Sequence, residues 1–186
     1  MIVAQKGFYY DMTACIACKA CQVACKDKND LPVEIVYRSV RTFEGGTYPQ
    51  SWSYNLSISC NHCEQPRCVE NCPTGARTKR TEDGLVVVDQ EACIGCQYCV
   101  WSCPYGASHY IEDKGVVGKC NGCVNLVTQG MNPACVDACV MRALEFGDIA
   151  ELRKKHPDAV QDMNGLPSSS LTGPSMLISC KPKAKK

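Results

Sequence analysis

The sequence has no long apolar run, almost no net charge and no recognisable leader segment. Its longest apolar stretches, Leu85 to Val88 and Met176 to Ser179, fall well short of the roughly 18 residues that a membrane-spanning helix needs. The 186 residues carry a formal net charge of +1, so no strong field indicates a nucleic-acid partner. The first residues, MIVAQKGFYYD, lack the charged and apolar regions of a signal peptide. We therefore expect a soluble chain of one large domain or two small ones.

Catalytic motifs are also absent from the sequence. It contains no nucleotide-binding fingerprint and no nucleophile beside a paired base. The C-x3-C-x2-C pattern, which leaves one iron of a cluster free for radical chemistry, is missing too. The only basic run, residues 181–186, is typical of a solvated, frayed chain end. We expect no catalytic residue and no enzyme activity of the chain on its own.

Cysteine, in contrast, is abundant, and its spacing is regular. Sixteen of the seventeen cysteines fall into four tetrads, whose short intervals are typical of iron–sulfur ligands. The tetrads are Cys15-x2-Cys18-x2-Cys21-x3-Cys25, Cys60-x2-Cys63-x4-Cys68-x3-Cys72, Cys93-x2-Cys96-x2-Cys99-x3-Cys103 and Cys120-x2-Cys123-x11-Cys135-x3-Cys139. Four clusters in one small protein would make a row of redox centres, and such a row is a path for electrons.

Two other uses of cysteine fit this pattern less well. Disulfide frameworks do not repeat the interval two, two, three with proline after the last cysteine, as bacterial ferredoxins do. A structural zinc site uses four ligands, usually as two separated pairs, and has no use for a third cysteine three residues after the second. Iron–sulfur clusters also suit the thiolate preference of soft metals.

The interval has a mechanical reason. In C-x2-C-x2-C a tight turn brings three thiolates to three corners of a cubane, and its amide N–H groups point at the cluster sulfurs. The fourth cysteine begins a helix and points away, so it must serve a neighbouring cluster.

Proline distinguishes the middle tetrads from the outer ones. Pro73 and Pro104 follow the last cysteines of the second and third tetrads, whereas Lys26 and Val140 follow those of the first and fourth. Between the middle tetrads, the sequence predicts a hairpin with a turn at 82–84. We expect an α+β fold of two nested ferredoxin-like two-cluster units. The inner unit spans 60–107, the outer unit spans 1–59 plus 108–157, and 158–186 forms a C-terminal linker and tail.

The remaining scaffold is predicted from local patterns. We expect strands over 7–10 and 55–59 and helices over 21–28 and 148–156. The segment MNGLPSSSLTGPS, residues 163–175, is rich in glycine, proline and serine and predicts an exposed linker. Residues 176–179 are expected to return as an edge strand, with docking on a partner as the alternative.

A few side chains have two interpretations. His62 could donate a hydrogen bond to a cluster, but we expect a partly exposed histidine that fills a loop position. Tyr98, Trp101 and Tyr105 could shield a cluster from water, and ordinary packing explains them equally well. Cys180 stands apart from the tetrads and is interpreted as a structural or incidental thiol.

The cysteine runs carry a family resemblance. Four cysteine-bearing segments resemble the four-cluster electron-transfer subunit of the dimethyl sulfoxide reductase family. They are FYYDMTACIACKACQVACKDKNDLP, SISCNHCEQPRCVENCPTGA, DGLVVVDQEACIGCQYCVWSCPYGA and KCNGCVNLVTQGMNPACVDAC, the last followed by MRALEFGDIAELRKKH. This belongs to the wider group of iron–sulfur subunits that serve molybdopterin oxidoreductases. The resemblance covers roughly residues 7–156 and includes all sixteen cysteines in order.

The resemblance implies a ligand map. Some relatives carry a non-cysteine residue in the third tetrad and hold a three-iron cluster there, but this chain has cysteine at every ligand position, which implies four 4Fe-4S clusters. The implied sets are Cys15, Cys18, Cys21 and Cys139 for cluster 1, Cys25, Cys120, Cys123 and Cys135 for cluster 2, Cys60, Cys63, Cys68 and Cys103 for cluster 3, and Cys72, Cys93, Cys96 and Cys99 for cluster 4. Cluster 1 would lie nearest the catalytic subunit and cluster 4 nearest the membrane partner.

The resemblance also implies a function and partners. The chain would relay electrons between a membrane quinol-reacting subunit and a molybdopterin catalytic subunit in anaerobic respiration, with no direct substrate of its own. Its expected place is a peripheral membrane complex on the extracytoplasmic face, reached by export with the catalytic subunit, or alternatively the cytoplasm. A free-standing polyferredoxin is the alternative function, although such a carrier should have an acidic docking face. A zinc protein is the third interpretation, which metal analysis would decide.

Overall fold

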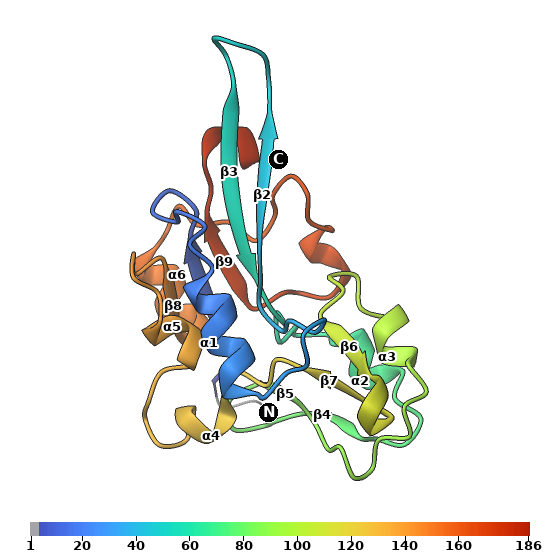
Figure 1. The fold of residues 1–186 in the computed structure, drawn as a ribbon. Coiled ribbons are helices and arrows are strands. Elements are labelled where there is room, and N and C mark those ends of the chain that lie inside the picture. Colours follow the sequence, from blue (N-terminus) through green and yellow to red (C-terminus); the bar gives the residue numbers. More distant parts are fainter. Residues whose placement is uncertain (1–3) are drawn as a thin grey trace.

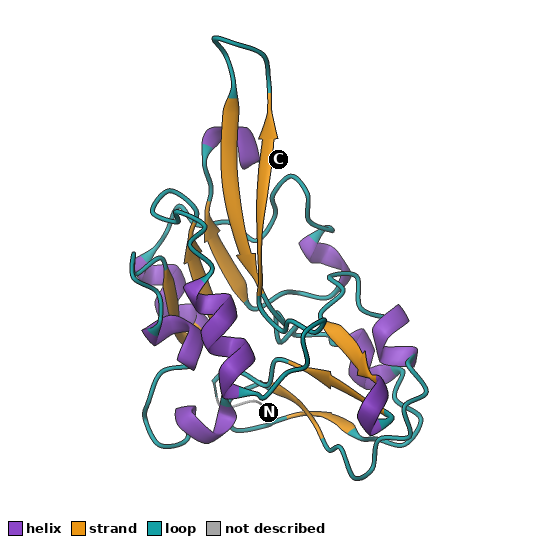
Figure 2. Ribbon diagram, in the orientation of Figure 1, coloured by secondary structure: helices purple, strands orange, loops and turns teal. Residues whose placement is uncertain are grey.

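Four small β-sheets, short helices and cysteine-bearing loops make up the fold (Figures 1 and 2). The computed structural model describes residues 4–186. Its strands are β1 Lys6–Asp11, β2 Ser39–Gly45, β3 Trp52–Ile58, β4 Arg77–Lys79, β5 Val86–Val88, β6 Ser108–Ile111, β7 Val116–Lys119, β8 Leu144–Asp148 and β9 Met176–Ser179. Its α-helices are α1 Ala20–Lys28, α2 Arg67–Glu70, α3 Tyr98–Trp101, α4 Val124–Val127, α5 Ala134–Asp137 and α6 Ile149–Lys155. Short 3-10 helices span Glu112–Lys114, Ser169–Leu171 and Pro182–Ala184.

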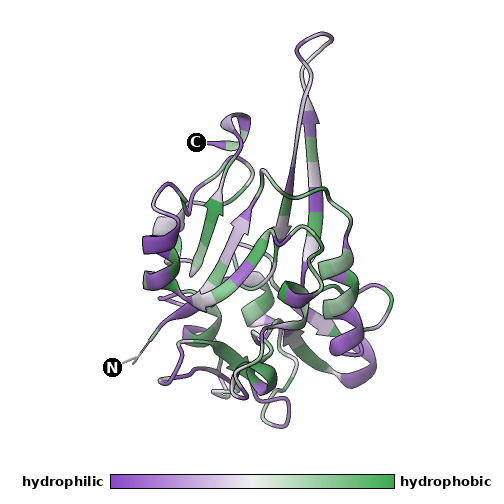
Figure 3. Cartoon of the chain, turned by 90° about the vertical axis from the view of Figure 1, so that its left-hand side faces the viewer, coloured by the Kyte–Doolittle hydropathy of each residue, from purple (hydrophilic) through white to green (hydrophobic). Residues whose placement is uncertain are grey.

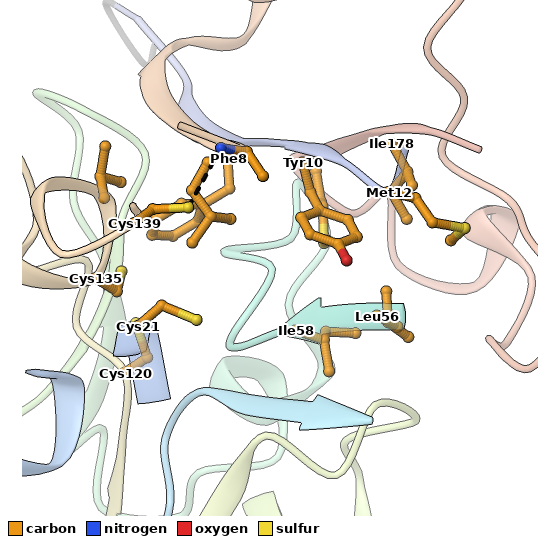
Figure 4. Packing of buried hydrophobic residues seen from close by; sticks show 14 of the residues in the cluster. Phe8, Tyr10, Met12, Cys21, Leu56, Ile58, Cys120, Cys135, Cys139 and Ile178 are labelled. Carbon is orange, nitrogen blue, oxygen red and sulfur yellow. Dashed lines mark hydrogen bonds between the residues drawn. The ribbon is translucent and has the colours of Figure 1, made fainter. Parts of the chain in front are cut away.

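The first strand is the centre of a three-stranded sheet. β1 pairs antiparallel with β8 and parallel with β9, in the order β8-β1-β9. Side chains alternate between the two faces of a strand, so Phe8 and Tyr10 enter the main core while Tyr9 packs with Leu152 of α6 on the other face. Figure 4 shows Tyr10 above Ile58 and Leu56 of β3, with Phe8 beside Cys139. The expected strand at 7–10 and the expected edge strand at 176–179 are both confirmed.

A long hairpin stands out from the body of the protein (Figure 1). β2 and β3 pair antiparallel over their full lengths, from Ser39 opposite Ile58 to Gly45 opposite Trp52. The far turn is hydrophilic, as Figure 3 shows, whereas the base of β3 is buried in the main core. β3 begins three residues before the expected strand at 55–59 and leads into the second tetrad.

Two short hairpins and two short helices surround the middle tetrads. β4 pairs with β5 and β6 pairs with β7, both antiparallel, while α2 packs against α3. The expected hairpin around the turn at 82–84 is therefore confirmed. Together with the helices these strands make a mixed fold, as the α+β class predicts.

The helix after β8 has a well-formed start. Asp148 caps α6, because its Oδ1 accepts hydrogen bonds from the N–H groups of Ala150 and Glu151 at 2.8 and 3.3 Å. Its last turn is basic, which suits the negative end of the helix dipole. The expected helices over 148–156 and 21–28 are confirmed within one residue at each end.

The expectation of an exposed linker over 163–175 is wrong. Met163 is fully buried in the main core, and Thr172 and Ser175 are buried as well. Backbone hydrogen bonds tie the segment to the second tetrad loop, since the N–H groups of Glu64 and Gln65 donate to Gly173 and Thr172. Glycine and proline here shape a packed loop whose polar backbone groups find partners, as burial requires.

The last residues also pack, contrary to the expected frayed end. Pro182–Ala184 form a 3-10 helix, and Ala184 is fully buried in the main core. The Asn164 N–H donates to the Ala184 carbonyl at 2.8 Å. Among residues 4–186, no helix is both long and apolar enough to cross a membrane.

Candidate metal centre

Backbone amides point at cysteine sulfurs in the loops of the tetrads. The Ala17 N–H donates to Cys15 Sγ at 3.5 Å, and the Gly122 N–H donates to Cys120 Sγ at 3.4 Å. Both donors have positive φ, 57° and 69°, which is the tight turn that directs the amide inward. Similar bonds reach the last cysteines of two tetrads, from Ala107 to Cys103 and from Ala143 to Cys139.

Four cysteines from opposite ends of the sequence line one cavity. Cys15, Cys18 and Cys21 of the first tetrad face it together with Cys139 of the fourth, and its walls are almost entirely apolar. Figure 4 shows Cys21 and Cys139 beside the buried face of β1. These are the four residues of expected set 1, and an apolar hollow lined by thiols suits a sulfur-rich cofactor.

A second group of cysteines is deeply buried where α1 packs against α5. Burial raises the pKa of the Cys25 thiol, and the nearby thiols of Cys120 and Cys135 raise it further, with a smaller effect of Cys123. Burial and neighbouring thiols likewise raise the pKa of Cys120 to about 11. The four residues of expected set 2 therefore interact electrostatically.

The middle tetrads form two further groups. Burial raises the pKa of Cys63 to about 12, and its thiol neighbours Cys60, Cys103 and Cys68 add to the rise, which joins all four residues of set 3. Cys99 has Cys93 and Cys72 as thiol neighbours, which joins three residues of set 4. Its fourth member, Cys96, is half-buried in the loop between Cys93 and Cys99.

Contacts between these groups give them an order. Cys21 of set 1 has Cys135 of set 2 as an electrostatic neighbour. Cys120 of set 2 has Cys60 of set 3 in the same way. The Arg77 guanidinium acts on Cys68 of set 3 and Cys99 of set 4. Residues of expected sets 1 and 2, of sets 2 and 3, and of sets 3 and 4 therefore lie near one another.

Each group consists of thiols without imidazole or carboxylate. Within residues 4–186, no three or more His, Cys, Asp or Glu side chains are arranged around a single metal ion. A four-iron cubane takes one thiolate at each of four corners, which is a wider arrangement than four ligands around one ion.

The expectation that His62 is partly exposed is wrong. Its side chain is fully buried between the loops of sets 2 and 3, and burial and the nearby Lys119 hold its pKa well below the usual range. The Val86 N–H donates to Nδ1 at 3.0 Å, so the ring proton is on Nε2, which lies 4.0 Å from Cys120 Sγ. The sequence has no local sign of this burial, which comes from strand β5.

Of the three aromatic residues near the third tetrad, Tyr105 is half-buried with Cys63 and Cys103 nearby, whereas the other two lie on the surface. Trp101 is 72% exposed and Tyr98 is 53% exposed, and their rings lie 5.8 Å apart on the surface. Neither the shielding interpretation nor the packing interpretation fits these two residues. Cys180 is half-buried against the main core, which raises its pKa.

Comparisons with known proteins agree with the cysteine pattern. The sequence model of the 4Fe-4S dicluster domain family matches residues 51–149, which hold the second, third and fourth tetrads. A chain of the anaerobic dimethyl sulfoxide reductase of Escherichia coli is 47% identical over 97% of this protein and 90% of its own length. The thiosulfate reductase electron transfer subunit PhsB of Salmonella typhi is 41% identical over 76% of this protein and 75% of its own length. A subunit of the sulfite dehydrogenase of Allochromatium vinosum is 35% identical over 87% of this protein and 76% of its own length.

These matches confirm two predictions made from the sequence, the resemblance and the 4Fe-4S cofactor. The likeness to the Escherichia coli dimethyl sulfoxide reductase protein extends over nearly the whole chain, including the first tetrad, which lies outside the matched domain. The chain therefore belongs to the family of iron–sulfur electron-transfer subunits of the dimethyl sulfoxide reductase type.

Proposed function

We propose that this chain is a non-catalytic electron-transfer subunit that passes single electrons between a quinol-reacting membrane subunit and a molybdopterin catalytic subunit. The observation that carries the proposal is the order of the cysteine groups, each of which has an electrostatic neighbour in the next. A 4Fe-4S cluster supplies one-electron chemistry when bound. The protein has to hold the clusters in a row, keep water away from them and present the two ends to partners.

The proposed ligand map assigns every cysteine of the four tetrads. Set 1 is supported by a shared cavity, and sets 2 and 3 by thiols that act on one another inside each set. Set 4 is supported by the neighbours of Cys99 and by the loop position of Cys96. A count of four clusters follows from sixteen cysteines in four sets of four.

The chain's own groups prepare these sites for negative charge. Burial raises the pKa of several of the ligand thiols, among them Cys25, Cys63 and Cys120, so cluster assembly must displace their protons. At Cys72 burial also raises the pKa, but hydrogen bonds that include the N–H groups of Arg77, Thr74 and Ala76 outweigh it and lower the pKa overall. These amides stabilise the thiolate form of Cys72, which lies close to the protein surface.

We also propose that the fold is two nested two-cluster units. The last cysteine of each tetrad joins the set of its partner tetrad, as Cys25 joins the fourth tetrad and Cys139 the first. Each unit is built around one helix pair, α1 against α5 in the outer unit and α2 against α3 in the inner one. This supports the division into 60–107 and 1–59 plus 108–157, with 158–186 covering the second tetrad loop.

Exposed apolar residues at both ends of the row support docking of two partners. Ile16, Val140 and Met141 are exposed beside set 1. Ile94 and Trp101 are exposed beside set 4. We assign the first surface to the molybdopterin subunit and the second to the membrane anchor. The complex would then be peripheral to the membrane, on the extracytoplasmic face.

The proposal is tested by removing one assigned ligand in the assembled complex. Cys96→Ser should alter the electron paramagnetic resonance of cluster 4 alone and slow turnover driven by quinol, because Cys96 is one of its four thiolates. Cys180→Ser is the matched control, since Cys180 lies outside the tetrads, and it should leave spectrum and turnover as they were. An unchanged spectrum and unchanged turnover in Cys96→Ser would show that the ligand map is wrong.

A further inference from the structure

Two arginine side chains are buried in the part of the chain that the structure describes, and both lie among cysteines. Arg38 is 1% exposed and Arg77 is 2% exposed. No ion pair among residues 4–186 includes either of them. Burying a cation without a partner is strongly unfavourable, so each guanidinium needs negative charge nearby.

Arg38 lies where set 1 meets set 2. Its guanidinium nitrogens donate to Ser57 Oγ at 3.2 Å and to Ser59 Oγ at 2.9 Å, and the group stacks 4.6 Å from the centre of the Phe8 ring. Its Nε is buried without a hydrogen-bond acceptor. Burial alone would lower the pKa of Arg38, but nearby cysteine side chains outweigh burial and raise it. In order of effect they are Cys135, Cys120, Cys21 and Cys25.

A hydrogen-bond relay connects Arg38 to a set 1 sulfur. A guanidinium has donors only, so Ser57 Oγ accepts from Arg38 and keeps its own hydrogen free. That oxygen lies 3.5 Å from Cys21 Sγ, and the hydroxyl therefore donates to the sulfur. Arg38 acts on set 2 directly through space and on set 1 also through this hydroxyl.

Arg77 occupies the matching place between sets 3 and 4. One of its nitrogens donates to Ser108 Oγ at 2.9 Å, while Nη2 is buried without a partner. Arg77 stands five residues after Cys72 of set 4, and Ser108, which accepts its hydrogen bond, stands five residues after Cys103 of set 3. These cysteines belong to different sets, so one guanidinium serves both.

We propose that each cluster pair shares one buried arginine, Arg38 for clusters 1 and 2 and Arg77 for clusters 3 and 4, and that this fixed charge raises the reduction potentials of both clusters in its pair. Reduction by one electron would add one negative charge to a cluster held by these cysteines. A nearby cation stabilises this reduced form more than the oxidised form. An arginine stays charged throughout, so the electron moves without a proton at this site. The inference rests on the proposed ligand map.

The test is a potentiometric titration of the intact complex followed by electron paramagnetic resonance. Arg38→Met should make the reduction of clusters 1 and 2 at least tenfold less favourable, which is about 59 mV for a one-electron couple, and leave clusters 3 and 4 unchanged. Arg77→Met should make the reduction of clusters 3 and 4 less favourable and leave clusters 1 and 2 unchanged. Arg38→Lys and Arg77→Lys keep the charge and should recover most of the potential. Arg41→Met, at an exposed arginine on β2, is the control and should shift none of them.

Several results would overturn the proposal. They are equal shifts in all four clusters, no shift in any, or lysine variants that behave like methionine variants. If the methionine variants fail to assemble, Ser57→Ala decides, because it keeps the Arg38 charge and removes the hydroxyl that links Arg38 to Cys21. It should lower the potential of cluster 1 more than that of cluster 2, and an unchanged cluster 1 would contradict the relay. All four clusters could be present, and the cysteine variants could lose their assigned clusters, while the arginine variants shift the potentials of neither pair. That result would reject this inference and leave the proposed electron-transfer function standing.

Discussion

The C-terminal segment should close the second tetrad loop, and Met163→Ala tests this closure. Met163 is 0% exposed and packs in the main core, so its truncation leaves a cavity. Such truncations cost about 2–5 kcal/mol, and a value of about 3 kcal/mol corresponds to roughly a hundredfold change in the opening equilibrium. The segment is tied down by two bonds of Ser175, whose N–H donates to the Asn61 carbonyl and whose hydroxyl donates to the His62 carbonyl.

Amide hydrogen exchange of the assembled complex measures this opening. In Met163→Ala the peptides around Ser175 and Gln65 should exchange roughly a hundredfold faster, because local opening is the step that exposes their amides. Cluster 3, whose loop the segment covers, should also be lost faster in air. Met131→Ala is the control at a 46% exposed methionine and should change neither rate. Equal exchange in the two variants would refute the view that the segment is part of the core.

Two further predictions concern α6 and the loop before the last strand. Asp148→Ala removes the cap of α6 and should cost about 1 kcal/mol, seen as faster exchange of the α6 amides, whereas Asp148→Asn should keep most of that stability. An unaffected helix would show that the cap contributes nothing. Hydrogen bonds from the hydroxyl and N–H of Ser169 lower the pKa of Asp162. A lowered folded-state pKa means that the stabilisation is present above the unfolded pKa and is lost as pH falls through the folded one. Protection of the Ser169 amide, corrected for intrinsic exchange, should therefore decrease in acid, and Asp162→Asn should abolish this dependence; the same acid response in that variant would contradict it.

The sequence predicts elements well where local patterns decide them. The expected strand over 7–10 is part of β1, and Asp148 followed by a basic last turn gives α6. The glycine turn before Leu85 gives the hairpin of β4 and β5. In each case the information lies within about ten residues of the chain.

Residues whose environment comes from distant segments were not predicted. His62 is buried because β5 and residue 175 close over it, and Met163 is buried because the chain returns under the long hairpin. Arg38 belongs to no motif, and its importance depends on thiols that stand from 13 to 97 positions away in the sequence. Composition made 163–175 resemble a linker, although its backbone is paired with the second tetrad loop.

The four cysteine sets are only partly predictable from local sequence. Spacing predicts the tetrads, but the expectation that the fourth cysteine begins a helix is wrong. The helices α1, α2, α3 and α5 each begin one residue before the third cysteine of a tetrad. The partner of each fourth cysteine depends on tertiary structure. The long-range choice of Cys139 for set 1 came from family resemblance, and the cavity that it shares with the first tetrad supports that choice.

The central claim is that sixteen thiolates hold four 4Fe-4S clusters, and metal analysis tests it most directly. The complex is purified without air, and iron, acid-labile sulfide and zinc are measured per copy of this chain, after correction for iron held by the partners. The account predicts about sixteen irons and about sixteen sulfides with no stoichiometric zinc. About four zinc ions per chain, or iron for only two clusters, would contradict it.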